Sequence, residues 1–159
     1  MADLRKLRAV IMDWMKIPMP RRRWMMLLVA APLIPLVILA VRNPGNEAKT
    51  APDHADARLR TRRYSGELSE AHRVLRTLIP QQKTYGRRWK LTETSSHQLK
   101  VEVPVLIFTD DLTVNLREDE DRVLIDVISR SRVGKGDFGE NRRHILQLLA
   151  ALDKQLSSL

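Results

Sequence analysis

The alternation of apolar and polar positions divides the chain into one uncharged run and a longer part with regular periodicity. Residues 24–41, "WMMLLVAAPLIPLVILAV", form a run of eighteen residues without a charge. At a helical rise of about 1.5 Å per residue the run covers about 27 Å, which just spans a hydrocarbon core. Pro32 and Pro35 lie inside it, and membrane helices tolerate prolines where neighbouring groups satisfy the freed carbonyls. We therefore expect a single transmembrane helix over residues 20–42.

A cleaved signal peptide is the alternative interpretation of this run. Its apolar core would be shorter and a small-x-small cleavage site would follow, whereas the sequence continues as Arg42-Asn43-Pro44-Gly45. The pattern therefore favours an uncleaved anchor. Residues 9–23 hold four Lys or Arg and residues 42–56 hold two. This asymmetry predicts a cytoplasmic amino terminus and a periplasmic or lumenal C-terminal domain.

The segment before the anchor has the pattern of an amphipathic helix. In "MADLRKLRAVIMDWMKI" the apolar residues recur at helical spacing, and most basic residues fall on other faces. We assign residues 1–19 to a helix that lies in the membrane interface. A helix that packs against a partner protein is the alternative, because it would bury the same stripe.

The part after the anchor begins without apolar periodicity and then becomes regular. Residues 43–63 are rich in Ala, Arg, Asp and Pro, which predicts a linker. From Tyr64 onward a first helix is indicated by one buried face and is stopped by Pro80. The members of that face are Leu68, Ala71, Val74, Leu75, Leu78 and Ile79.

Period-two alternation then predicts three or four strands. Their apolar members are Trp89 and Leu91; Leu99, Val101, Val103, Val105 and Ile107; Leu112, Val114 and Leu116; and Val123, Ile125 and Val127. The charged segment 117–121 links the last two strands as a hairpin loop. Pro104 implies an edge position or a bulge. We also expect Trp89, Tyr64 and Phe108 to belong to the core.

A final helix carries the apolar stripe Ile145, Leu148, Leu149, Leu152 and Leu156. The predicted fold is therefore α+β: a single N-terminal transmembrane helix, followed by a soluble domain over residues 64–159. In that domain an antiparallel sheet of three or four strands is packed with two helices on one face.

Charge and composition exclude several classes of function. The formal net charge is +9, but residues 1–23 account for +5, residues 24–63 for +3 and residues 64–159 for only +1. A duplex-binding domain would concentrate positive charge on itself, so no nucleic-acid partner is expected. The chain has no cysteine, which excludes disulfides and thiol catalysis.

The stretch "SRSRVGKGDFGENRR", residues 129–143, contains Gly134, Gly136 and Gly139 at the spacing of a dinucleotide-binding loop. That loop needs a second parallel strand after the helix, with an acid about 20 residues on, and the sequence shows neither. We therefore expect a tight turn in which Gly134 and Gly136 supply positive φ. Asp137 is the predicted cap of the last helix, and Asn141 is a rival cap.

Arginines at the amino end of that helix need an anion, because they face its positive pole. Asp110 and Asp111 are the candidates within the chain, and ion pairing of these carboxylates with Arg130 or Arg132 is the favoured interpretation. The alternative is a pocket for an anion such as a lipid phosphate. Its members would be Arg130, Arg132, Lys135, Arg142 and Arg143.

Catalytic and metal-binding patterns are weak. The four histidines lack metal-ligand spacing, so we expect no metal and no cofactor. Asp110 and Asp111 are adjacent and would point to opposite faces of a strand, which disfavours an acid/base dyad. We expect a protein that is not an enzyme.

Three segments, "YSGELSEAHRVLRTLIP", "FTDDLTVNL" and "VLIDVISRSRVGKGDFGENRRHI", resemble in order and spacing a bacterial and plastid family, domain of unknown function 1499. The resemblance covers about residues 64–152 and is most specific over residues 129–143. Many relatives carry a Pro-Asn-Cys segment before the domain, where this chain has its Arg-rich segment. The resemblance implies the family's fold and no reaction.

These observations predict a membrane-anchored, non-enzymatic accessory or assembly subunit of a larger respiratory or photosynthetic complex. Its location would be a bacterial inner membrane or a photosynthetic membrane, and its partners would be membrane lipid and other membrane protein subunits. The alternative is a module that binds an anion or a lipid headgroup through the arginine cluster.

Overall fold

The computed structural model describes residues 45–134 and 136–156. The predicted interfacial helix, residues 1–19, and the predicted anchor, residues 20–42, lie outside these residues. Neither helix within the described ranges has the length and apolar character needed to cross a membrane.

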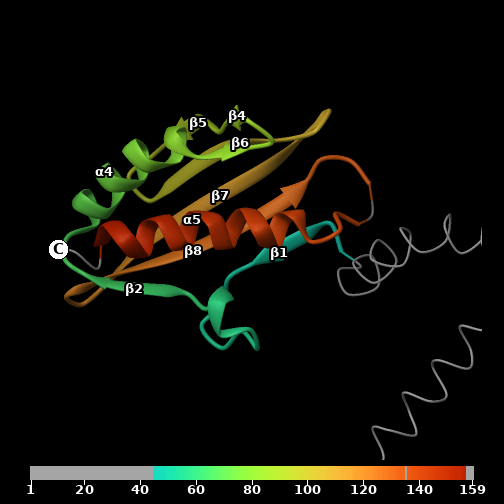
Figure 1. Cartoon of the computed structure of the whole chain (residues 1–159). Helices are drawn as coiled ribbons and strands as arrows, with labels where there is room; N and C mark the ends of the chain where they lie inside the picture. Colours follow the sequence, from blue (N-terminus) through green and yellow to red (C-terminus); the bar gives the residue numbers. More distant parts are fainter. Residues whose placement is uncertain (1–44, 135, 157–159) are drawn as a thin grey trace, which may run out of the picture. The chain divides into compact units, whose positions relative to one another are not determined.

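The described residues form an α+β fold with one antiparallel sheet covered by two helices (Figure 1). The main sheet has six strands and runs β1-β8-β7-β6-β5, with β2 also paired to β8. Its strands are β1 (Glu47–Lys49), β2 (Arg62–Ser65), β5 (Lys90–Thr94), β6 (Gln98–Val105), β7 (Phe108–Asp119) and β8 (Arg122–Ser131). The short strands β3 (Lys83–Thr84) and β4 (Arg87–Arg88) form a separate hairpin. The helices are α4 (Leu68–Leu78), α5 (Glu140–Leu156) and the 3-10 turns η1 (Ala57–Leu59) and η2 (Ile79–Gln81).

The core lies between the sheet and the two helices, as the periodicity predicted. Alternate residues of β6, β7 and β8 are buried, among them Leu99, Leu112 and Ile125. Leu75 of α4 and Leu148 of α5 are fully buried against this face. Each such side chain contributes about 1.5–3 kcal/mol through removal of apolar surface from water, so this layer is the main stabilising element of the fold.

The prediction of a linker over residues 43–63 was wrong, and the sheet is larger than the expected three or four strands. β1 pairs with residues 128–130 of β8, and β2 pairs with residues 122–125. Both strands lie along the edge of β8 that β7 leaves free. They were not predicted because they are only three and four residues long and most of their exposed positions are charged.

Asp126 holds this segment to the sheet on the face away from the helices. Its Oδ1 atom accepts hydrogen bonds from the hydroxyl groups of Thr50 at 3.0 Å and Thr61 at 2.6 Å. Its Oδ2 atom accepts one from Arg117 at 3.2 Å. The Thr50 hydroxyl in turn accepts the backbone N–H of Val127 at 2.8 Å. One carboxylate therefore joins both ends of the segment between β1 and β2 to β8.

Two details of the strands refine the predictions. β7 extends to Asp119, so only Glu120 and Asp121 form the turn before β8, and Glu120 has a φ of 57°. Pro104 lies two residues beyond Glu102, the last β6 residue that pairs with β5, so it occupies a local edge where its missing N–H is tolerated.

The aromatic predictions were correct for Trp89, which is buried in the core, and Tyr64 is partly buried against it. Phe108 was expected in the core, but it is exposed at the start of β7. The reason is its position beside the β6–β7 turn, beyond the part of the sheet that the helices cover.

We expect Asp126→Ala to lower the free energy of unfolding by about 1–3 kcal/mol, because it leaves partly buried hydroxyl groups without their acceptor. Residues 50–61 should also become more sensitive to limited proteolysis in the full chain. Asp121→Ala is the control, since that side chain is exposed in the β7–β8 turn. Equal proteolysis of the two variants would show that Asp126 does not hold the segment.

Candidate functional site

The predicted cluster of aspartates and arginines is divided between the two faces of the sheet. Asp111 lies on the open face, where its carboxylate accepts hydrogen bonds from Arg132 Nε at 3.0 Å and Nη2 at 2.6 Å. Arg132 also donates to Glu102 at 2.9 Å across the neighbouring strand. The pKa of Arg132 is raised, first through its hydrogen bond to Asp111 and then through Glu102. Asp110 is buried on the opposite face, under the helices.

The other arginines of the predicted pocket turn to different carboxylates. Arg142 pairs with Asp56, which caps η1 and also binds Arg58. These hydrogen bonds, that of Arg58 first, hold the pKa of the Asp56 carboxyl well below its usual range. Arg143 pairs with Glu140. The exposed side chain of Arg130 lies in β8, opposite Glu47 and Asp111, and Lys135 lies outside the described residues.

The four described arginines therefore do not converge on one pocket. This differs from the alternative prediction, in which they line a single anion site. Three of them are paired with carboxylates of the chain itself. In β7 and β8 the alternation of side chains separates neighbours in sequence to opposite faces. This alternation places Asp110 and Asp111 on opposite faces, so the two carboxylates do not share one site.

The glycine-rich stretch is a turn that ends in a helix cap. Gly134 and Gly139 have φ values of 91° and 87°, a region that glycine adopts without steric cost. Gly136 lies between them in the same turn. Asp137 accepts the backbone N–H of Gly139 at 2.9 Å and of Asn141 at 2.7 Å. Asp137 is thus the cap of α5, and its negative charge suits the positive helix end.

Asn141, the predicted rival cap, is instead a fully buried residue inside α5. Its Nδ2 group donates to the backbone oxygen of Asn46 at 2.8 Å and to the Ser131 hydroxyl at 3.0 Å. Its Oδ1 atom accepts from the Ser129 hydroxyl at 2.7 Å. The amide therefore joins the start of β1, the end of β8 and the first turn of α5 through satisfied hydrogen bonds.

Asp110 and His144 face each other next to Asn141. His144 Nδ1 lies 3.7 Å from Asp110 Oδ2, and His144 Nε2 lies 3.5 Å from Glu140 Oε2. Three atoms, Asp110 Oδ2 and the two ring nitrogens of His144, are buried without a hydrogen-bond partner in the described part of the chain. Such groups are costly to bury, so this pair is the least satisfied point of the interior.

Burial shifts both groups of the pair toward their neutral forms. It raises the pKa of the Asp110 carboxyl, an effect that the hydrogen bond with Ser131 opposes. It lowers the pKa of His144 to about 4, while Glu140 acts in the opposite direction. At neutral pH the imidazole is therefore uncharged. We define the buried polar cluster as Asp110, Ser129, Ser131, Asn141 and His144.

The β3–β4 hairpin covers the buried polar cluster. Trp89, just after β4, packs edge-on against His144 with ring centroids 6.0 Å apart. Its indole N–H donates to the Thr84 hydroxyl at 2.7 Å. Tyr85 donates to Glu140 at 2.9 Å, and the guanidinium of Arg143 lies 5.1 Å from the Tyr85 ring centroid. Trp89 therefore packs directly on His144, whereas Tyr85 contacts Glu140 and Arg143 at the surface.

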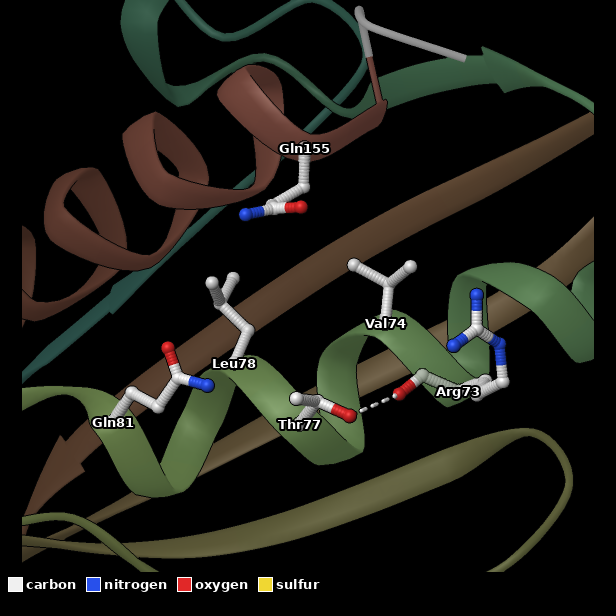
Figure 2. A pocket seen from close by; sticks show the side chains of 6 residues that line it. All are labelled: Arg73, Val74, Thr77, Leu78, Gln81 and Gln155. Atoms are coloured by element: carbon white, nitrogen blue, oxygen red, sulfur yellow. Dashed lines mark hydrogen bonds between the residues drawn. The ribbon is translucent and has the colours of Figure 1, made fainter.

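A hollow between α4 and α5 has different chemistry (Figure 2). It measures about 140 Å³, whereas small-molecule sites have volumes of about 300–1,000 Å³. Within α4, the Thr77 hydroxyl donates to the backbone oxygen of Arg73 at 3.2 Å. The Arg73 side chain pairs with Glu70. The volume of the hollow is therefore below that of an ordinary small-molecule site. The lining residues are Arg73, Val74, Thr77, Leu78, Gln81 and Gln155.

The buried polar cluster was not predicted from the sequence, although a signal for it was present. Asn141 extends the stripe of Ile145, Leu148 and Leu152 backward by one turn, which places it on the buried face of α5. In the same way Ser129 and Ser131 continue the alternation of β8, and Asp110 continues that of β7. The burial of these polar residues, which lie at the ends of apolar faces, could therefore have been predicted from the helical and strand periodicity alone.

We expect His144 to make stability fall as pH is lowered. Its pKa is about 4 in the folded state and about 6.5 when unfolded, so protons bind the unfolded chain more strongly between these values. Stability should therefore be lost from about pH 6.5 downward, by about 2 kcal/mol at pH 5. The raised pKa of Asp110 acts with opposite sign, since it favours the folded state at low pH.

Urea unfolding of the full chain in detergent, compared between wild type and His144→Gln, isolates the histidine. The wild type should lose about 2 kcal/mol more than the variant between pH 7.5 and pH 5. Parallel pH profiles for the two proteins would contradict the assignment of a buried, neutral His144.

Comparison with known families places these features in context. A family model described as "Protein of unknown function (DUF1499)" matches residues 39–152. The match begins well before Tyr64, in agreement with the finding that β1 and β2 belong to the sheet. A search of curated proteins gave no significant match.

Proposed function

The chain belongs to the DUF1499 family, and on this premise we propose that it is a membrane-anchored, non-enzymatic accessory subunit of a larger membrane protein complex. In this proposal residues 20–42 form the anchor, the amino terminus is cytoplasmic, and the described domain lies on the periplasmic or lumenal side. The domain serves as a binding surface close to the membrane.

The observation that carries the proposal is the short connection between the apolar run and the sheet. The uncharged run ends at Val41, and the backbone oxygen of Asn46 already accepts the N–H of Ser131 at 2.8 Å. A chain spans at most about 3.6 Å per residue, so residues 42–46 cover no more than about 18 Å. A domain tied in this way stays near the bilayer surface.

The described charges support binding over catalysis. Arg132, Arg142 and Arg143 are each paired with a carboxylate of the chain. Their ion pairs hold these guanidinium groups within the chain. Asp110 and His144 are buried in the interior, away from a substrate in solvent.

We expect the wild-type chain, solubilised with a mild detergent, to migrate in a native gel with other membrane proteins. An insertion of about twenty Gly and Ser residues between Asn43 and Pro44 should weaken this association about tenfold, because the longer tether lowers the effective concentration of the domain. The same insertion after Leu159 is the matched control.

Two results would contradict the proposal. A lone monomer with no co-purifying membrane protein would exclude the accessory role. Release of the chain from membranes by alkaline carbonate would exclude the anchor.

A further inference from the structure

Exposed apolar side chains gather at one end of the described domain. They come from the β3–β4 turn, the β6–β7 turn and the loop between β8 and α5. Figure 1 shows the β6–β7 turn and the β8–α5 loop at the end of the sheet where β1 begins. We call this set the apolar end; its members are Tyr85, Leu106, Ile107, Phe108, Val133 and Phe138.

Contacts between the three turns make the apolar end one surface. Arg87 of β4 donates to the backbone oxygen of Leu106 at 2.9 Å, which joins the first two turns. Tyr85 donates to Glu140 at the start of α5, which joins the first turn to the loop after β8. The β7–β8 register pairs Asp110 with Ser131, so Phe108 and Val133 lie two positions beyond that pair.

The composition of these turns is unusual for a surface in water. Turns are ordinarily formed by Gly, Asn, Asp, Ser and Pro, whereas the tip of the β6–β7 turn consists of Leu106 and Ile107, which are 62% and 85% exposed. Leu106 and Phe138 also have positive φ values of 48° and 53°, a conformation that large side chains rarely adopt. Contiguous exposed apolar side chains of this kind mark an interaction surface.

Charge distinguishes the apolar end from the opposite end of the sheet. The far β7–β8 turn and the strand ends beside it, residues 117–122, read "REDEDR" and hold four exposed acids. At the apolar end Asp111 and Glu102 are paired with Arg132, and Glu140 is paired with Arg143. An anionic surface would therefore repel the far end. It would not repel the apolar end, where the acids named are paired and the exposed Arg87 adds a positive charge.

The chain also enters the sheet at the apolar end. Asn46 bonds to Ser131, two residues before Val133, and only residues 42–46 separate this point from the uncharged run. If that run spans the bilayer, as the proposed function requires, the apolar end is the part of the domain that its tether holds beside the bilayer.

We propose that the apolar end is a membrane-seating surface. Ile107, Leu106 and Phe138 insert among the lipid headgroups of the leaflet from which the anchor emerges. Arg87 lies at the level of the phosphates, and the Tyr85 ring occupies the interface, where aromatic residues are favoured. This inference rests on the anchor in the proposed function, but it does not depend on the partner complex.

The chain has no cysteine, so single labels can be placed without background. We would introduce Ile107→Cys, Phe138→Cys and, as the control, Asp121→Cys in the far turn, where the side chain is 83% exposed. Each full-length variant carries an environment-sensitive dye and is reconstituted in phosphatidylcholine vesicles, with or without phosphatidylglycerol. Spin-labelled lipid serves as the quencher.

The dyes at positions 107 and 138 should be quenched several-fold more than the dye at position 121. Quenching that is equal in both lipid mixtures assigns the contact to apolar insertion, and quenching that grows with phosphatidylglycerol adds an anionic headgroup contribution. Adding Ile107→Glu to the position 138 variant should reduce its quenching, while the thermal unfolding midpoint stays unchanged because Ile107 contacts solvent.

Two outcomes would overturn the inference and are distinguishable from failure of the anchor. If the chain floats with vesicles but all three dyes are quenched equally, the domain does not seat on lipid. If the dyes are shielded in native membranes but not in vesicles, a protein partner covers the apolar end instead. A chain that does not float with vesicles disproves the anchor itself, and this proposal with it.

Discussion

The pairing of β1 with the last residues of β8 is the contact on which the other features depend. It fixes residues 47–49 beside residues 128–130 and brings the Asn46 carbonyl within reach of both Ser131 and Asn141. The same three-residue strand therefore extends the sheet to residue 47, places the Asn46 carbonyl as an acceptor for Asn141 and shortens the connection to the apolar run. Without it, residues 47–49 would lose their strand partner and Asn141 would lose one acceptor.

Much of the fold could be predicted because the buried apolar residues recur at the spacing of a strand or of a helix. Leu99, Leu112 and Ile125 alternate with polar residues, and the stripe of α5 repeats at helical spacing, so the core layer and the antiparallel order followed from the sequence. β1 and β2 could not be predicted in this way. Their pairing is chosen by the free edge of β8 and by Asp126, which are contacts between residues far apart in the chain.

In the candidate site, too, the local features were predictable from the sequence and most of the long-range contacts were not. The cap at Asp137 was predictable because a side chain and the N–H groups two and four residues later meet locally. The pair of Arg132 with Asp111 was among the expected ion pairs. The other partners were not predictable: Arg142 meets Asp56 and Arg132 meets Glu102 only after the sheet and η1 are in place. A dense cluster of charges in the sequence thus became several separate ion pairs, which leaves the exposed apolar turns as the most unusual surface of the domain.

The central claim is that the sheet begins immediately after the apolar run, and amide hydrogen exchange of the full chain tests it most directly. The N–H of Thr50 donates to the Val127 oxygen at 2.9 Å, and that of Val127 donates back to the Thr50 hydroxyl at 2.8 Å. The account predicts that the Thr50 amide exchanges as slowly as the Val127 amide, because both open only with the sheet. Exchange of Thr50 at the rate of an unstructured peptide, with Val127 still protected, would contradict it.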